Sequence, residues 1–290
     1  MSYMTVAVTV VLALMLAPVI GALLTGLDRK ITARIQGRVG PPLLQPFYDV
    51  RKLFGKDAIA LNQFQIMYAF LHLAFMMMVV LLLAMGQDML MILFAHTFST
   101  MALVMGGMCV RSPYSRIGSH RKMLQMLAYE PILVLMVVGI YLTNAAAGHR
   151  SFLAGDVLLA GKPLLLSLPL VFLTFLTSMA IKLEKSPFDI ASSHHAHQEL
   201  VKGVTLEYSG PYLAIIEITH FYETFVLFGI LTMFWAPCIP VGIAIAAVCF
   251  LALIVLDNAM ARLTSMWMIR FMWTVPMVLA LSNIIWLYYR

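Results

Sequence analysis

Charged residues are scarce in this chain. Asp, Glu, Lys and Arg make up 11% of its 290 residues, 62% are hydrophobic, and the mean hydropathy is +0.93. A soluble domain of this length must cover its surface mainly with polar groups, which this composition excludes. The sequence instead predicts an all-α, polytopic transmembrane helical bundle that forms a single integral membrane domain over residues 1–290.

Cysteines are also few. The three, Cys109, Cys238 and Cys249, form no CxxC pair or other metal-ligand spacing and lie in or beside apolar runs. This argues against a disulfide framework and against an iron–sulfur cluster held by this chain alone. The N-terminal run lacks the basic n-region and the cleavage site of a signal peptide, so we expect a retained first span.

Long apolar runs occur throughout the chain. Runs of roughly 17–25 residues can cross a bilayer as helices. No internal repeat is visible, which weakens an inverted-repeat transporter as the interpretation. We expect about eight spans, at residues 3–25, 66–86, 89–110, 123–147, 164–182, 210–234, 238–256 and 270–288.

The basic residues are divided unequally between the loops. Of the 19 Lys and Arg residues, only Arg150, Lys162 and Arg290 fall in the even-numbered loops or the termini. Because cytoplasmic loops carry the excess of Lys and Arg, we expect the odd-numbered loops in the cytoplasm and both termini outside. This placement explains the net charge of +6 without nucleic acid as a partner.

Two large polar segments, 26–65 and 183–209, therefore lie on the expected cytoplasmic side. A bundle with its polar mass on one face is expected to dock a partner there. The alternative is a solvated positive face that meets anionic lipid. That alternative explains the charge but not the lengths of the loops.

The first polar segment contains several glycines and prolines, which forbid one continuous helix across it. The apolar spacing of Phe47, Val50, Leu53 and Phe54, with charged residues on the opposite face, predicts a short amphipathic helix along the membrane interface. Taken alone, such a basic stretch is more often a surface anchor than a binding site.

Ionisable residues inside the expected spans are rare. Glu130 lies in the fourth span, and Glu217, His220 and Glu223 lie at i, i+3 and i+6 in the sixth. These steps keep neighbouring side chains on one helix face, where they could pass a proton. The alternative for any one Glu is an ion pair with a basic residue on a neighbouring helix. His72 and His96 are isolated, and we expect hydrogen-bonded core histidines.

A histidine cluster interrupts the second polar segment. His194, His195 and His197 lie near Glu199, so a zinc site is geometrically possible. No fourth ligand is evident. We therefore expect no metal here and favour contact with a partner or a pH-sensing role.

Three motifs carry a resemblance to a known family. Asp28-Arg29-Lys30, Gln36, Arg38 and Gly40-Pro41 form the first, and Gln125 with Tyr129-Glu130 forms the second. The third is Pro187-Phe188-Asp189, followed by Glu199-Leu200-Val201, Gly203 and Glu207-Tyr208-Ser209-Gly210. The chain resembles the membrane subunit shared by energy-converting [NiFe]-hydrogenases and respiratory complex I.

The departures from complex I are informative. Gly40-Pro41 runs almost directly into Leu44-Gln45-Pro46, Lys182 and Lys185 precede Pro187, and the segment before Glu199 is longer and His-rich. In complex I this region helps to build the quinone chamber, so these changes put quinone binding in doubt. The short loop and the His-rich segment are similar to the Ech-type hydrogenase branch.

The resemblance implies a non-redox coupling subunit of a ferredoxin-linked, H2-evolving hydrogenase in the cytoplasmic membrane of a prokaryote. The implied partners are the hydrogenase large and small subunits, a ferredoxin-like cluster subunit and an antiporter-like membrane subunit, together with the lipid bilayer. This chain itself would bind no cofactor, because the NiFe centre and the iron–sulfur clusters belong to those partners. The coupling ion, H+ or Na+, stays open.

The expected site residues fall into two sets. The ion path comprises Glu130, Glu217, His220 and Glu223 inside the bundle, with Asp189, Glu199 and Glu207 at its cytoplasmic entrance. The docking residues are Arg29, Arg34, Gln36, Arg38, Asp49, Lys182, Lys185, His194 and His197. The alternatives are the same fold in a formate hydrogenlyase or an NADH:quinone oxidoreductase, a free-standing secondary ion transporter, and a membrane anchor without an ion path.

Overall fold

The expected all-α class is confirmed. A computed structural model describes residues 3–59, 62–146, 148, 151–159, 161–189, 191 and 202–289. These residues form eleven α-helices and one 3-10 turn without a β-strand. The helices are α1 (Tyr3–Ile35), α2 (Gln45–Phe54), α3 (Gln63–Ala84), α4 (Met89–Met108), α5 (Pro113–Ala146), α6 (Ala154–Leu159), α7 (Leu164–Ser167), α8 (Pro169–Lys182), α9 (Gly210–Met233), α10 (Ile239–Ala259) and α11 (Ser265–Tyr289), with η1 (Gly203–Thr205) before α9.

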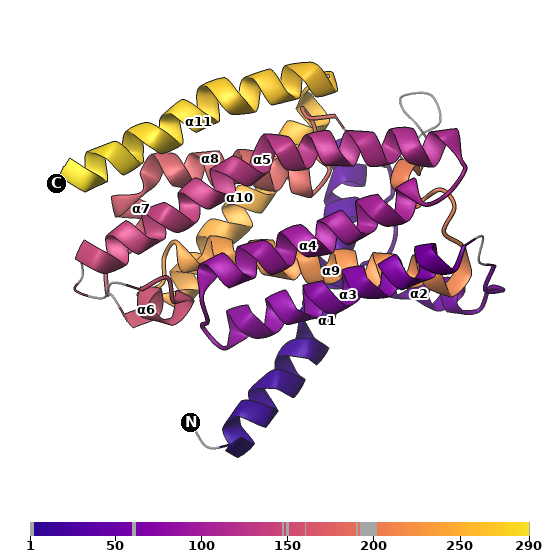
Figure 1. Ribbon diagram of the computed structural model, residues 1–290, viewed down its shortest axis with the longest axis horizontal. Helices are drawn as coiled ribbons and strands as arrows, with labels where there is room; N and C mark the ends of the chain where they lie inside the picture. Colours follow the sequence, from indigo (N-terminus) through magenta and orange to yellow (C-terminus); the bar gives the residue numbers. More distant parts are fainter. Residues whose placement is uncertain are drawn as a thin grey trace.

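Seven helices, α1, α3, α4, α5, α9, α10 and α11, are long and apolar enough to cross a membrane. They coincide with seven of the expected spans. The chain is thus a multi-pass membrane protein. α3 and α4 pack side by side, α9 lies against α1 and α3, and α5 separates α4 from α11 (Figure 1).

The fifth expected span, 164–182, is not one continuous helix. It is divided at Leu168 into α7 and α8. Pro169 disfavours the helical conformation at the residue before it and has no backbone N–H to donate. The buried Asn283 of α11 fills the break. Its Oδ1 accepts hydrogen bonds from the backbone N–H groups of Leu170 (3.0 Å) and Val171 (3.2 Å), and its Nδ2 donates to Ser167 O (3.2 Å).

The predicted amphipathic helix in the first polar segment is confirmed as α2. Pro46 occupies its first turn, where a missing N–H is tolerated. Leu53 packs against the buried cluster of Leu213 and Ile216 on α9, whereas Arg51 on the other side of α2 is exposed. α2 lies at one end of the bundle with the beginnings of α3, α5 and α9, on the right in Figure 1. The described parts of the two large polar segments therefore meet at a single end of the molecule.

α1 and α9 approach closely at Gly21. A Cβ built on Gly21 would lie 2.0 Å from the carbonyl oxygen of Phe221, which belongs to the α9 backbone. Small residues allow this type of contact between membrane helices, where van der Waals packing rather than the hydrophobic effect holds the helices together. The contact matters because Phe221 lies between His220 and Tyr222, so α1 fixes the part of α9 that carries the titratable residues.

We expect Gly21→Ala to destabilise the protein by about 1–3 kcal/mol, because the backbone of α9 must move to admit the methyl group. Gly55→Ala is the matched control, since a Cβ there would lie 3.6 Å from its nearest neighbour and the φ of Gly55 is −82°. The free energies of unfolding of both variants can be compared in detergent. Equal stability of the two variants would contradict the packing argument.

Candidate functional site

Glu223 on α9 is the centre of a buried cluster of ionisable groups. Its Oε1 lies 3.3 Å from Nε2 of His96 on α4 and 3.8 Å from Nζ of Lys182 on α8. Its Oε2 lies 3.7 Å from Nδ1 of His220, one turn away on α9. Three helices therefore contribute to one carboxylate. We call Glu223, His96, Lys182 and His220 the Glu223 cluster.

Lys182 is the buried cation of this cluster. Its side chain is only 1% exposed, its Nζ lies 3.1 Å from Nδ1 of His96, and it sits 4.1 Å from the centre of the Tyr129 ring. A buried ammonium is costly unless charges and hydrogen bonds compensate for its lost hydration. Glu223 supplies the opposite charge and Tyr129 a cation–π contact. Removal of either charge would leave the other without its main compensation.

Glu130 on α5 is a further, partly buried carboxylate close to the Glu223 cluster, and it is held by a residue of α4. Both of its carboxylate oxygens accept a hydrogen bond from Oγ1 of Thr97, at 2.9 and 2.8 Å. Thr97 directly follows His96 in the sequence. The α4 backbone thus places Glu130 next to the Glu223 cluster.

The two core histidines behave differently. His72 is buried, and its Nδ1 lies 2.8 Å from the carbonyl oxygen of Ser99, which is the hydrogen-bonded core position that the sequence predicts. His96 is not isolated as predicted, because the packing of the bundle brings it to Lys182 of α8 and Glu223 of α9. His96 thus joins the Glu223 cluster.

A polar cavity leads to this cluster from the end of the bundle where the large loops meet. Its volume is about 310 Å³, and the α9 stripe of Glu217, His220 and Glu223 lines it. Carboxylates from three other segments face the same space: Asp28 on α1, Glu184 after α8 and Asp257 on α10. The predicted stripe therefore faces one polar cavity, as a path to Glu223 requires.

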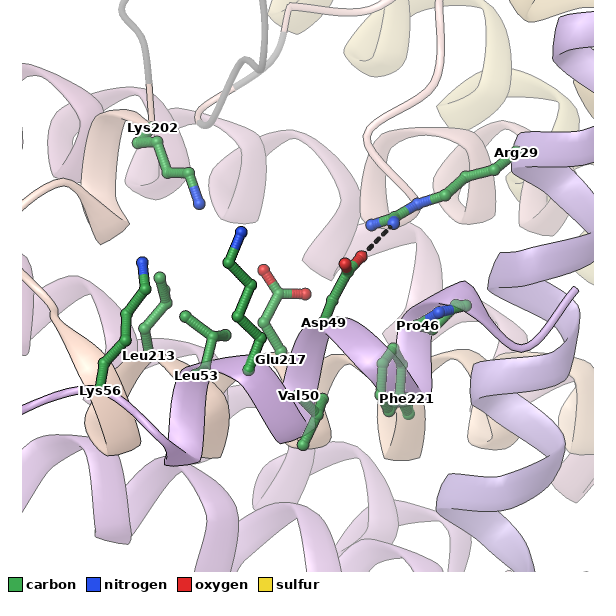
Figure 2. A pocket seen from close by; sticks show the side chains of 11 residues that line it. Arg29, Pro46, Asp49, Val50, Leu53, Lys56, Lys202, Leu213, Glu217 and Phe221 are labelled. Carbon is green, nitrogen blue, oxygen red and sulfur yellow. Dashed lines mark hydrogen bonds and ion pairs between the residues drawn. The ribbon is translucent and has the colours of Figure 1, made fainter. Parts of the chain in front are cut away.

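A second cavity, of about 420 Å³, lies between α2 and α9 (Figure 2). Glu217 lines both cavities and stands where they adjoin. Asp49 of α2 accepts hydrogen bonds from Arg29 (2.8 Å) and Gln45 (2.9 Å) at the edge of this space. Burial alone would raise the pKa of Asp49, but the bonds from Gln45 and Arg29 outweigh it and hold the pKa below its usual value.

Ion pairs connect the segments that line the polar cavity. Lys185 bridges Asp28 (2.7 Å) and Asp257 (3.0 Å), and so connects the segment after α8 with α1 and α10. Burial would lower the pKa of Lys185, but the two carboxylates outweigh burial and raise it. Lys122 of α5 pairs with Glu184 at 3.1 Å. Together these ion pairs hold four segments around the cavity.

The structure largely buries two of the residues that the sequence predicts to dock a partner. Lys182 is buried in the Glu223 cluster and Lys185 is mostly buried between two carboxylates, so neither offers a surface to a partner. Arg34, Gln36 and Arg38 are exposed at and after the last turn of α1, where docking stays a prediction. Arg29 and Asp49 pair with each other at 36% and 40% exposure.

The predicted entrance residues are only partly described. Asp189 is bonded to Arg121 (3.5 Å) and to Ser265, and its carbonyl oxygen accepts from Gln125, so it fastens α5 to α11. Neither Asp189 nor Glu207 lines the two cavities described above. Glu199, His194, His195 and His197 lie outside the described residues.

Sequence reasoning missed several residues of the site. The common signal was available: Asp28, Lys122, Glu184 and Asp257 are charged residues within or at the ends of apolar helices, where charge is rare and usually functional. What the spacing along one helix cannot show is which side chains meet across helices. Among residues 3–59, 62–146, 148, 151–159, 161–189, 191 and 202–289, no group of three or more His, Cys, Asp or Glu is arranged to hold a metal ion.

Fold and site together define a polytopic membrane subunit with an internal acid–base cluster that opens to one end of the bundle. The chain belongs to the NADH dehydrogenase family, whose model matches residues 7–288. The H subunit of NADH-quinone oxidoreductase from Geobacillus kaustophilus is 28% identical to it over 94% of this chain and 90% of its own length. Hydrogenase-4 component C of Escherichia coli is 26% identical over 96% and 93%, respectively.

A solved structure supports the same fold. A chain in the structure of the membrane-bound sulfane sulfur reductase, an archaeal respiratory membrane complex, superimposes with a TM-score of 0.85 and 22% sequence identity. The match covers 98% of this chain and 99% of that one. These comparisons confirm the resemblance, drawn from the sequence motifs, to the membrane subunit shared by complex I and energy-converting hydrogenases.

Proposed function

We propose that this chain is the membrane-anchoring and ion-coupling subunit of a multisubunit, ferredoxin-linked, H2-evolving [NiFe]-hydrogenase. The observation that carries the proposal is the Glu223 cluster, a buried acid with a cation and two imidazoles, reached through a polar cavity. A plain anchor has no use for such a cluster, because ionisable groups in a membrane interior are costly. The relationship to Hydrogenase-4 component C supports the choice of complex.

The docked redox arm would contact the end of the bundle where the loops meet. In this arrangement the large loops face the cytoplasm and the chain lies in the cytoplasmic membrane, in agreement with the excess of Lys and Arg in those loops. The hydrogenase large and small subunits and the ferredoxin-like subunit would supply the NiFe centre and the clusters. Exposed Arg34, Gln36 and Arg38 are the described residues best placed for this contact.

The ion path would begin in the polar cavity. A change of charge in the docked arm would act electrostatically on Glu184 and Glu217, which line this cavity. A proton taken up at Glu217 could pass through His220 to Glu223, whose Oε2 faces His220. In this proposal Glu184 and Glu217, rather than Asp189 and Glu207, form the entrance, because the former line the cavity.

The proton would then leave Glu223 on its other side. Protonation of Glu223 weakens its attraction to Lys182 and His96, and loss of the proton restores that attraction. Glu223 thus contacts two sets of partners, His220 through Oε2 and both His96 and Lys182 through Oε1. Glu130, fixed by Thr97, is the next carboxylate and would pass the charge to an antiporter-like membrane subunit.

A second candidate is the same subunit in an NADH:quinone oxidoreductase. The cavity between α2 and α9, with a volume of about 420 Å³, is large enough for a ring-shaped headgroup. The NADH-quinone oxidoreductase relative from Geobacillus kaustophilus has a sequence identity similar to that of the hydrogenase relative. A formate hydrogenlyase would use the same coupling subunit with a different electron donor.

Purification of the intact complex through a tag on this chain tests the proposal. We expect nickel and iron in the preparation, hydrogenase subunits by mass spectrometry, and H2 production with reduced ferredoxin. NADH-oxidising subunits without nickel would instead support the quinone oxidoreductase. Ion transport by the chain purified alone would contradict both and favour a free-standing transporter.

A further inference from the structure

The cavity between α2 and α9 has an unbalanced positive charge. Four basic residues line it, but Arg29 is already paired with Asp49 at 2.8 Å. The remaining lysines, Lys52, Lys56 and Lys202, face one further carboxylate, that of Glu217. In the part of the chain that the structure describes, neither an ion pair nor a hydrogen bond joins these three ammonium groups to an acid.

The lysines come from two segments, α2 with its end and the start of η1, and converge. Lys56 follows the end of α2, and Lys202 directly precedes η1. In Figure 2 their ammonium groups point toward each other across the cavity, with the Glu217 carboxylate nearby. Lys202 has a φ of +59°, a conformation that disfavours any residue with a Cβ. Like charges brought together repel each other, so this arrangement gains most from a bound anion.

One side of the same cavity is apolar. Pro46, Val50 and Leu53 of α2 and Leu213 and Phe221 of α9 line it. A free inorganic anion would use the lysines but leave this surface wet. A neutral ring compound would use the apolar surface but not the lysines. A ligand that pairs with the lysines and also covers the apolar surface must have an anionic headgroup joined to a hydrocarbon chain.

We propose that this cavity binds a phosphate-bearing membrane lipid. The phosphate would lie among Lys52, Lys56 and Lys202, and the first part of an acyl chain would lie along Val50, Leu53 and Phe221. The place suits such a ligand, because α2 is the interfacial helix and basic pockets between membrane helices on the cytoplasmic side recognise anionic headgroups. The volume of about 420 Å³ falls within the range of roughly 300–1,000 Å³ that is usual for ligand sites. The inference does not depend on which redox partners the subunit has.

Native mass spectrometry of the intact, detergent-purified complex tests this proposal. The probes are phosphatidylglycerol, phosphatidylcholine with the same acyl chains, and water-soluble glycerophosphoglycerol. We expect phosphatidylglycerol to bind at least tenfold more tightly than phosphatidylcholine, and glycerophosphoglycerol to compete poorly. Equal binding of the two lipids would overturn the assignment. Competition by glycerophosphoglycerol equal to that of the lipid would make the cavity a site for soluble anions and would also overturn it.

The double variant Lys56→Gln/Lys202→Gln tests the residues. Each lysine contributes about 1 kcal/mol, or about fivefold in affinity, so the double variant should bind phosphatidylglycerol on the order of thirtyfold more weakly. The matched control is Lys30→Gln/Arg51→Gln, which removes the same charge from α1 and α2 outside the cavity. Unchanged binding in the cavity variant, or an equal loss in the control, would refute the site. If the double variant fails to assemble, Lys56→Gln, at an exposed position, should still weaken binding about fivefold.

Discussion

Glu223→Gln is expected to lower ion pumping by the intact complex about a hundredfold or more, a loss typical of removing a group that transfers protons. Gln keeps the shape of the side chain but cannot take up or release a proton. His220 and the His96–Lys182 pair would then have no titratable group between them. The soluble redox half should keep its dye-linked activity. Proton or sodium uptake into proteoliposomes, measured beside the dye assay, checks both expectations.

Two further variants sharpen this result. Glu217→Gln removes the acid that lines both cavities and should also impair pumping. Asp156→Asn is the control, because it removes a carboxylate from α6, away from the two cavities. Unchanged pumping in both Glu217→Gln and Glu223→Gln would refute the assigned path. A loss of pumping in Asp156→Asn of equal size would show that the effect is not specific.

Lys182→Met is expected to have the largest effect on stability. It leaves the Glu223 carboxylate buried without its ammonium partner, and breaking a buried pair in this way costs about 3–5 kcal/mol. Met has a similar length and suits the surrounding apolar side chains. The free energy of unfolding in detergent, followed by denaturant titration, measures the loss. Lys162→Met, at an exposed position outside the cluster, should change stability little.

The double variant Lys182→Met/Glu223→Gln separates stability from function. With both charges removed, most of the lost stability should return, because a neutral pair has no uncompensated charge. Pumping should remain absent, since the proton-accepting group is still missing. A double variant as unstable as Lys182→Met alone would show that the two residues do not compensate each other. A double variant that pumps normally would contradict the role of Glu223.

Much of the fold could be predicted from the sequence because long apolar runs and the amphipathic spacing of α2 are local properties. The seven long helices and α2 belong to this class. The break between α7 and α8 has a local cause in Pro169, but its stabilisation could not be predicted in the same way. It depends on Asn283, more than a hundred residues away, whose side chain bonds the backbone freed at Pro169.

The candidate site, like the fold, could be predicted from the sequence only where it depends on local spacing. The α9 stripe of Glu217, His220 and Glu223 follows from spacing on one helix, and the structure places all three on the polar cavity. The other two partners of Glu223 lie on α4 and α8, and their approach depends on how those helices pack. Basic residues at the ends of spans normally reach the membrane surface, which is why the sequence predicts docking for Lys182. The packing of α8 places it inside.

The short α8 helix has a consequence for the depth of Lys182 in the bilayer. A helix of 14 residues rises about 21 Å, whereas the hydrocarbon core is about 30 Å thick. A full-length span would carry a terminal lysine to the lipid headgroups, where water and phosphate surround it. Here the ammonium faces Glu223 and His96 instead. The break at Leu168 thus leaves Lys182 on a helix too short to cross the hydrocarbon core by itself.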